Sequence, residues 1–120
     1  TVLIRKLRIN AIASLNDITE GTYIGITLLS PFGMANRKPV FALINLIADK
    51  IKVFGKDNNH LKLFFVYQGK EVEALAFNNT EFVKSIDFTK SIDIAGTIER
   101  NEWNGKVSIF IKIDDIRQNN

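Results

Sequence analysis

The sequence has 120 residues, of which 46% are hydrophobic and 24% are charged, with 16 Lys and Arg against 13 Asp and Glu. This length and composition are those of one globular domain, and they exclude a disordered tail and a membrane span, which needs about 18 consecutive apolar residues. The absence of cysteine excludes disulfides, thiolate metal sites and cysteine nucleophiles, and it fits a reducing, intracellular setting.

Positive charge is concentrated in the N-terminal third. Residues 1–39 hold five basic and two acidic side chains, whereas residues 40–120 hold 11 of each. By charge alone, the larger part of the chain is therefore not expected to be a strong nucleic-acid binder. The chain begins with Thr1 and shows no signal-peptide pattern, so we expect a fragment of a longer protein.

The first 39 residues predict a strand, a helix and a loop. β-Branched residues over 2–12 favour an extended segment. Possible N-cap residues at 14, 16, 17 and 19 predict a short helix that ends near Leu29. Ser30-Pro31 ends that helix, and residues 32–39 form a connecting loop.

From residue 40 onward the pattern is that of strands separated by short turns. Residues 40–54 form a long apolar run that is interrupted at Asn45, which predicts a bent or bulged strand. Asn104-Gly105 is a strong hairpin turn signal. Thr80 can cap a short helix that runs to about Ile86. The other expected strands cover residues 60–67, 71–77, 91–99 and 107–113.

This order, three strands, a short helix and a closing hairpin, is that of the oligonucleotide/oligosaccharide-binding (OB) fold. The expected structure is therefore mainly β: a five-stranded OB barrel with a helix between strands three and four, preceded by a small α/β segment. A β-sandwich and an SH3-like barrel are the alternatives, and the helix in that position favours the OB fold.

The inventory of reactive side chains does not predict an enzyme. His60 is the single histidine, which excludes a multi-histidine metal site, and no phosphate-binding glycine motif occurs. We expect His60 to bond locally at a strand end. Asp114 and Asp115 are expected to end the last strand, because adjacent strand residues point to opposite faces and do not converge on a cation. We therefore expect no catalytic residue and no metal or cofactor in this chain.

Strand alternation predicts a binding face instead. The residues expected in the core are Leu61, Leu63, Phe65, Tyr67, Val72, Ala74, Ala76, Val107, Ile109, Ile111 and Ile113. This leaves Phe64, Phe77 and Phe110 outside, together with Lys62 and Lys112. Aromatic rings beside cations form a stacking platform for unpaired bases. The same apolar face could instead pack against the rest of a longer protein, and both interpretations stay open here.

Trp103 precedes the Asn104-Gly105 turn and is expected at a loop tip. We expect it to cover the end of the barrel rather than to stack on a base. Arg100 and Lys106, on either side of it in the sequence, are the expected phosphate contacts.

Several motifs in order resemble the RecJ-type single-strand-specific exonucleases. Leu29 to Phe41 resembles the family's L-x-P-F-G-x-G-N-x-x-P-x-F signature, and His60 to Leu63 resembles its G…H-L-K-L strand. Glu73 to Phe77 resembles its D/E-A-I-A-F strand, and residues 101–117 resemble its N-x-W-x-G…D-I-R ending. The family commonly has Gln where Phe110 stands, so a stacking or packing contact is expected in place of a polar one.

The resemblance implies a parent protein with a DHH phosphoesterase core that uses Mn²⁺ or Mg²⁺ to degrade single-stranded DNA from its 5′ end. This chain has no Asp-His-His triplet. It resembles the tail of a DHHA1-like domain over residues 1–39 and the OB domain over residues 40–120. The implied partners are single-stranded DNA and the DHH and DHHA1 domains of the same protein, with no membrane, in the bacterial cytoplasm. The expected DNA contacts are Lys62, Phe64, Phe77, Arg100, Lys106, Phe110 and Lys112.

Overall fold

A computed structural model of the chain describes residues 9–29, 38–77 and 84–119. Its strands form one seven-stranded sheet in the order β1-β2-β6-β7-β5-β4-β3. The elements are β1 (Ala11–Ile12), a 3₁₀ turn (Leu15–Asp17), α2 (Glu20–Leu29), β2 (Phe41–Leu46), β3 (Lys50–Phe54), β4 (His60–Tyr67), β5 (Lys70–Ala76), β6 (Ile92–Trp103) and β7 (Lys106–Gln118). The prediction of a mainly β fold is confirmed.

The N-terminal helix forms where the cap residues predicted it. The Thr19 hydroxyl oxygen accepts a hydrogen bond of 3.2 Å from the Thr22 backbone N–H, which satisfies one of the unpaired donors at the start of α2. The helix ends at Leu29, as predicted. Just before it, the Asp17 carboxylate accepts a 2.9 Å bond from the Ser14 N–H and steadies the 3₁₀ turn.

The long apolar run bends at Asn45, as its sequence predicted. Asn45 has a φ of 57°, and the register of β2 against β6 shifts between Leu43 and Leu46. The bend is sharp enough to make two strands rather than one, with residues 47–49 between them. β2 pairs with β6, whereas β3 pairs with β4 at the other end of the sheet order, so this segment curls the sheet back on itself.

The predicted count of five strands is wrong, because the described residues already form seven. The bend at Asn45 divides one predicted strand into β2 and β3, and β1 adds a short parallel pair with β2. The remaining strands keep the expected order, and β5 and β7 are neighbours in the sheet that pair in parallel. Most of the helix predicted from Thr80 to Ile86, most of the loop over 32–39 and the start of the segment over 2–12 lie outside the described residues.

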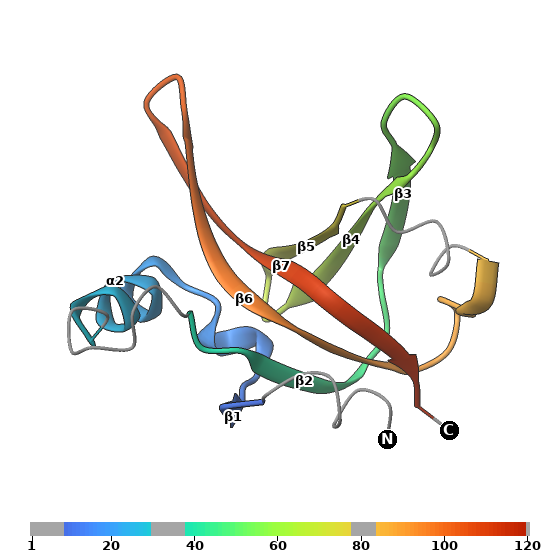
Figure 1. Ribbon diagram of the computed structural model, residues 1–120, viewed down its shortest axis with the longest axis horizontal. Coiled ribbons are helices and arrows are strands. Elements are labelled where there is room, and N and C mark those ends of the chain that lie inside the picture. The colour runs from blue at the N-terminus through green and yellow to red at the C-terminus, as the bar shows by residue number, and fades with distance from the viewer. Residues whose placement is uncertain (1–8, 30–37, 78–83, 120) are drawn as a thin grey trace.

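Two hairpins rise on the same side of the molecule (Figure 1). One is the β3–β4 hairpin, which turns at residues 55–59. The other is the β6–β7 hairpin, which turns at Asn104 and Gly105 with φ angles of 50° and 76°. These angles belong to the primed turns that match the twist of antiparallel strands, so the predicted Asn-Gly turn is confirmed. We call the two projections the β3–β4 arm and the β6–β7 arm.

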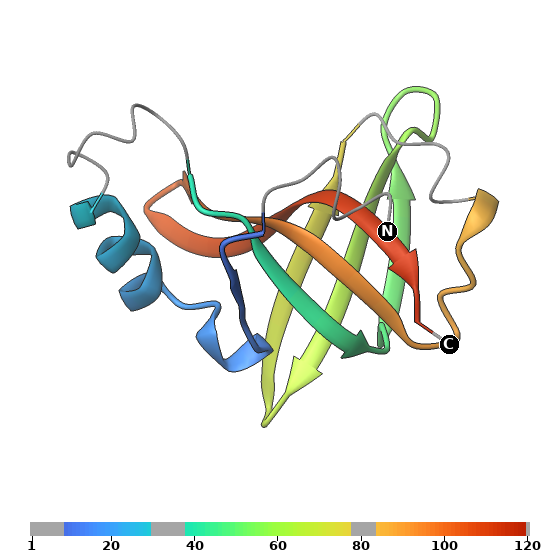
Figure 2. The same ribbon diagram turned by 60° about the horizontal axis from the view of Figure 1, so that its bottom comes forward.

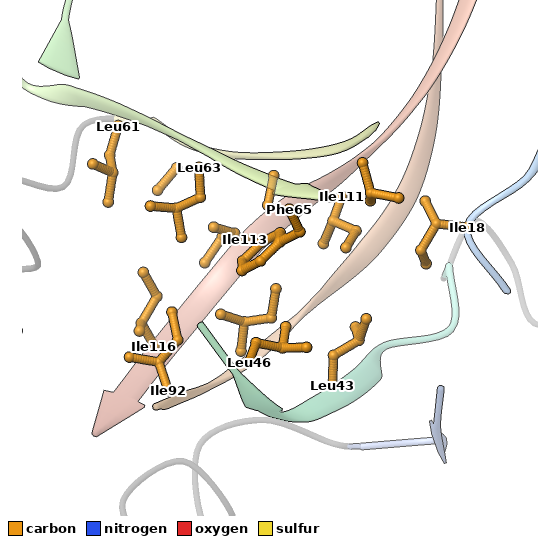
Figure 3. Close-up of a cluster of buried hydrophobic side chains, with 14 of the residues drawn as sticks. Ile18, Leu43, Leu46, Leu61, Leu63, Phe65, Ile92, Ile111, Ile113 and Ile116 are labelled. Atoms are coloured by element: carbon orange, nitrogen blue, oxygen red, sulfur yellow. The ribbon is translucent and has the colours of Figure 1, made fainter. Parts of the chain in front are cut away.

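One hydrophobic core holds the sheet together, and it includes the N-terminal segment (Figure 3). Its largest fully buried side chains are Leu43, Leu61, Leu63, Phe65, Ile92, Ile94 and Ile111. Ile18, next to α2, is 2% exposed and belongs to the same cluster. The described residues before 39 therefore share a core with the strands that follow, while the division into domains at residue 39 stays a prediction.

The inward residues predicted on the middle strands are confirmed, but two at strand ends are not. Tyr67 and Val107 are 39% and 40% exposed. Tyr67 lies beside the β4–β5 turn, and Val107 lies on the projecting β6–β7 arm, so neither reaches the barrel interior. Asp114 and Asp115 do not end the last strand, since β7 continues to Gln118 past an irregularity in its pairing with β6 at Ala95 and Gly96.

Candidate nucleic-acid interface

The side chains that point away from the core form ordered rows across β3, β4, β5, β7 and β6. The strand registers align one row that we call the lysine row: Lys52, Lys62, Leu75, Lys112 and Thr97. Two residues along each strand lies a second row, the phenylalanine row: Lys50, Phe64, Glu73, Phe110 and Glu99. Because side chains two apart share a face, both rows lie on the outside of the barrel.

A third row lies on the other side of the lysine row, near the β3–β4 turn. Here the ring centroids of Phe54 and His60 are 5.2 Å apart, and those of His60 and Phe77 are 5.4 Å apart. We call these three residues the aromatic row. The predicted placement of His60 at a strand end is confirmed, and the structure adds that its ring packs between two phenylalanines.

Two lysines approach the ring of Phe64: Lys50, which lies opposite it on β3, and Lys62, which precedes it by two residues on β4. The Lys50 and Lys62 ammonium groups lie 4.7 Å and 5.2 Å from the centroid of its ring. Both distances are within the range of a cation–π attraction. Lys62 also pairs with Glu73 at 3.2 Å, across from Phe64 on β5. An aromatic face and positive charge are thus supplied at one place.

The carboxylates of this surface are held by specific partners. Burial raises the pKa of Glu99, but hydrogen bonds from Lys38 and Thr97 outweigh burial and hold that pKa below its usual range. Burial raises the pKa of Asp114 above its usual range, and the nearby Lys112 offsets part of this effect. Glu99 is therefore ionised and paired, whereas the ionised form of Asp114 is disfavoured.

Several lysines on the same surface have no such partner. Among the described residues, no carboxylate lies within ion-pair distance of Lys50, Lys52, Lys106 or Lys112. The three rows together contain four lysines and two glutamates, and Asp114 near Lys112 adds one carboxyl whose ionised form is disfavoured by burial. The even charge balance of residues 40–120 along the chain therefore does not hold over this surface, which we call the outer face.

Six of the seven predicted contact residues share this face. Lys62, Phe64, Phe77, Phe110 and Lys112 belong to its rows, and Lys106 continues the same side of β7 toward the arm tip. Arg100 does not join them. It pairs with Ile109 across the hairpin, on the core side, and its guanidinium lies 3.5 Å from Glu20 and 3.4 Å from Glu102.

Trp103 does not cover the barrel end as expected, because it is 73% exposed at the tip of the β6–β7 arm. Three contributors to the outer face were missed in the sequence: Lys50, Lys52 and Phe54. All three lie within residues 40–54, which the sequence analysis treats as one apolar strand without assigning its outward side chains. The alternation Lys-Ile-Lys-Val-Phe over Lys50–Phe54 was the available signal, since it has the period of a half-exposed strand.

A hollow of about 350 Å³ lies at the far end of β4 from the β3–β4 turn. It is lined in part by Ile44, Ile47, Val66 and Tyr67, all of them exposed. No group of three potential metal ligands occurs among the described residues. None of the helices in the described ranges has the length and hydrophobicity to cross a membrane.

Solved structures with a similar fold include RecJ exonucleases and single-stranded-DNA-binding proteins. RecJ from Thermus thermophilus, solved with Mn²⁺, has a TM-score of 0.71 at 19% identity and covers 95% of this chain and 16% of that chain. The mitochondrial single-stranded-DNA-binding protein Rim1 of S. cerevisiae has a TM-score of 0.52 at 11% identity, over 68% of this chain and 96% of that one. The predicted OB fold is confirmed.

The sequence comparison agrees with the fold. The single-stranded-DNA-specific exonuclease RecJ of Bacillus subtilis (strain 168) is 27% identical over 107 residues, which is 89% of this chain and 14% of that protein. The chain thus spans about one seventh of the length of its relative. Residues 9–115 match the family described as the RecJ OB domain, and the chain belongs to that family.

Proposed function

We propose that this chain binds single-stranded DNA on its outer face, without strong sequence preference. The observation that carries the proposal is the alignment of a lysine row between two rows that contain aromatic rings. Binding of unpaired strands combines positive charge that follows the phosphates with rings on which bases stack. The face between strands two and three of an OB fold, here β4 and β5, is where such folds take oligonucleotides.

In this proposal, the phosphates are bound by the lysines that have no carboxylate partner in the described ranges. Lys50, Lys52 and Lys112 can each meet a phosphate without first breaking an ion pair. Lys62 would exchange Glu73 for a phosphate, at little cost because a partly exposed pair contributes at most about 1 kcal/mol. Phe64, Phe77 and Phe110 supply stacking surfaces on either side of the lysine row.

In the parent protein, this binding would hold the strand for a metal-dependent 5′ to 3′ exonuclease core of the DHH type. The chain covers a small share of its RecJ relatives, so that core lies in the part of the parent outside this sequence. Its T. thermophilus relative has been solved with Mn²⁺ and with Mg²⁺. We place the metals and the hydrolysis in that core and the strand contact in this chain.

The alternative is a scaffold module that packs on the catalytic core without touching DNA. The hollow at the far end of β4 favours it, since Ile47 and Val66 beside it are 60% and 54% exposed. Apolar patches of this kind mark surfaces that another protein segment covers. The occupant we assign is the remainder of the parent chain, which makes up most of the relatives' length.

Fluorescence anisotropy separates the two. We would titrate the 120-residue chain into a labelled single strand of about 20 nucleotides, longer than the sites of about 4–16 nucleotides that OB folds cover. With about four phosphate contacts, a fourfold rise in salt should weaken binding roughly 50-fold, because released counterions oppose association. Binding to the duplex of the same sequence should be weaker. Absence of binding at low salt would contradict the proposal and favour the scaffold alternative.

A further inference from the structure

The tip of the β6–β7 arm is an Asn-Gly step in open solvent. Asn104 and Gly105 form its two-residue turn, with φ angles of 50° and 76°, between the paired residues Trp103 and Lys106. Every residue from 101 to 108 is exposed. Figure 1 shows this tip well away from the other strands. The turn therefore lies outside the hydrophobic core.

The side-chain amide of Asn104 and the backbone nitrogen that follows it are both accessible. Within the described ranges, the Asn104 amide makes no hydrogen bond, and neither does the Gly105 backbone N–H. A Cβ on Gly105 would meet no atom within 4 Å, so the space beside this residue is open. An amide carbon and a main-chain nitrogen therefore stand next to each other with no partner that restrains either of them.

The asparagine at the bend after β2 is in the opposite situation. The Asn45 side-chain oxygen accepts a 2.7 Å hydrogen bond from Asn119 Nδ2, and the Asn45 backbone N–H donates a 3.0 Å bond to Asp93 Oδ1. The next residue is Leu46, whose branched side chain is buried. Both Asn45 and Asn104 have positive φ, so exposure and the following residue distinguish them, not the backbone angle.

The arm is braced at its base and not at its tip. The Arg100 guanidinium lies 3.5 Å from the Glu20 carboxylate on α2, the helix that Figure 2 shows beside the arm. Beyond Arg100, the strand pairs within residues 101–108 are exposed. Strand ends of this kind open at a small free-energy cost, because few buried contacts are lost. Such opening lets the backbone at Asn104 rotate.

We infer that Asn104 is a site of spontaneous covalent modification, at which the amide is converted through a succinimide to aspartate and isoaspartate. The Gly105 nitrogen loses its proton and bonds to Cγ of Asn104, while the bond from Cγ to Nδ2 breaks and ammonia leaves. Water then opens the ring. Hydrolysis at Cγ gives aspartate, whereas hydrolysis at the main-chain carbonyl carbon gives isoaspartate, whose backbone runs through the former side chain. Water is the single co-reactant, and no group is oxidised or reduced.

The modification changes both the charge and the length of the turn. Each product adds a carboxylate, so 16 basic residues face 14 acidic ones and the formal net charge falls from +3 to +2. Isoaspartate also lengthens the main chain by one carbon atom inside a two-residue turn. Pairing of Trp103 with Lys106 depends on a turn that matches the strand twist, so the strands should separate at the tip.

The sequence around the turn makes the reaction simple to follow. Trypsin cleaves after Arg100 and Lys106 and so releases residues 101–106, a peptide that contains the single tryptophan of the chain. We would incubate the 120-residue chain at physiological temperature in mildly alkaline and mildly acidic buffers and analyse this peptide by mass spectrometry. A species heavier by one mass unit should accumulate and separate into two chromatographic peaks. It should form faster in the alkaline buffer, because the attacking nitrogen must lose its proton.

The chain offers two matched controls. Asn101 lies in the same peptide but precedes Glu102, whose side chain hinders attack by its nitrogen, so fragmentation of the peptide should place the added mass at Asn104 alone. Asn104→Gly removes the reacting amide and retains a Gly-Gly turn of the same class, so this variant should keep its original mass. A parallel incubation in guanidinium chloride gives the rate for the unfolded chain, which the folded chain should approach.

The outcomes decide the inference without any measurement of DNA binding. Conversion of Asn104 in the folded chain, with Asn45 and Asn101 unchanged, would support it. Conversion in guanidinium chloride but not in the folded chain would show that the turn protects the amide and would overturn it, as would equal rates at Asn101 and Asn104.

The effect on the arm has a separate readout. The modified chain carries an added negative charge and can be isolated by ion exchange. Amide hydrogen exchange of the isoaspartate form should be faster within residues 101–108 than in the original chain and unchanged at the buried residues of β4. Equal exchange of the two forms within residues 101–108 would overturn the expected loosening of the tip.

Discussion

At the scale of single residues, Gly96 is the described glycine at which an added side chain would make the shortest contact. A Cβ on Gly96 would lie 2.2 Å from the Lys112 carbonyl oxygen on the neighbouring strand. This close approach occurs where the register of β6 against β7 shifts, and it requires a residue without a side chain.

Gly96→Ala should therefore destabilise the fold by about 3 kcal/mol, the upper part of the range for overpacking. Urea unfolding followed by circular dichroism would measure the change. Gly25→Ala is the matched control, because its Cβ would meet nothing within 4 Å and it lies inside α2. That variant should gain up to about 1 kcal/mol from the higher helix propensity of alanine. Equal stabilities of the two variants would contradict this account of Gly96.

Phe64 is the residue at which stacking and charge meet. Phe64→Leu keeps an apolar side chain of similar burial but removes the ring that Lys50 and Lys62 approach. We expect the Kd for single-stranded DNA to rise about fivefold or more, since one base loses its stacking partner. Ile12→Ala, an exposed substitution on β1, should leave the Kd as it is. A Kd unaffected by Phe64→Leu would remove this ring from the site.

At the scale of the elements, the irregular part of β7 places the Asp114 carboxyl where burial disfavours its ionised form. Asp114 stands beside Lys112 and has a pKa raised chiefly by burial. A carboxyl whose folded pKa is raised binds its proton more tightly in the folded state than in the unfolded chain. The free energy of unfolding therefore decreases as the pH rises through the folded pKa of Asp114. Below the unfolded pKa of about 3.9, the carboxyl is protonated in both states and this decrease is absent.

Asp114→Asn should accordingly stabilise the protein at pH 7 and have little effect below about pH 3.5. Thermal unfolding at several pH values would test this dependence. The same variant removes a negative charge next to Lys112, so it should also tighten single-stranded-DNA binding at pH 7. A stability gain that persists at low pH would assign the effect to packing instead of ionisation.

At the scale of the whole molecule, the distribution of charge matters more than its sum. Lys50 and Lys52 lie on the outer face, whereas Lys84 and Lys90 are exposed outside its rows. Replacing either pair by glutamine lowers the net charge equally. If binding followed net charge alone, the two double variants would bind alike.

We expect Lys50→Gln with Lys52→Gln to weaken single-stranded-DNA binding and to reduce the slope of log K against log salt by about 1.4, or about 0.7 for each phosphate that is no longer neutralised. Lys84→Gln with Lys90→Gln should preserve the slope. Anisotropy titrations at several salt concentrations would provide both values. Equal slopes for the two double variants would show that the outer face is not the site of phosphate binding.

Local sequence patterns were sufficient to predict most of the elements and much of the core. The apolar alternation of β4, β5 and β7, the break at Asn45 and the Asn104-Gly105 turn are local signals, and each is confirmed. Their order was enough to predict an OB fold and, with the ordered motifs, a RecJ-type relationship. Local patterns suffice here because strand alternation and turn geometry depend on neighbours in the chain.

The outer face, in contrast, depends on long-range pairing. Lys52 and Lys62 meet across the local β3–β4 hairpin, but Lys112 joins their row only through the pairing of β5 with β7, in which Leu75 lies opposite Lys112. For the same reason, the ion pair of Arg100 with Glu20 and the exposure of Trp103 could not be predicted. Alternation tells which side chains share a face, but the tertiary structure sets which of them meet, which charges are paired, and how far an arm projects.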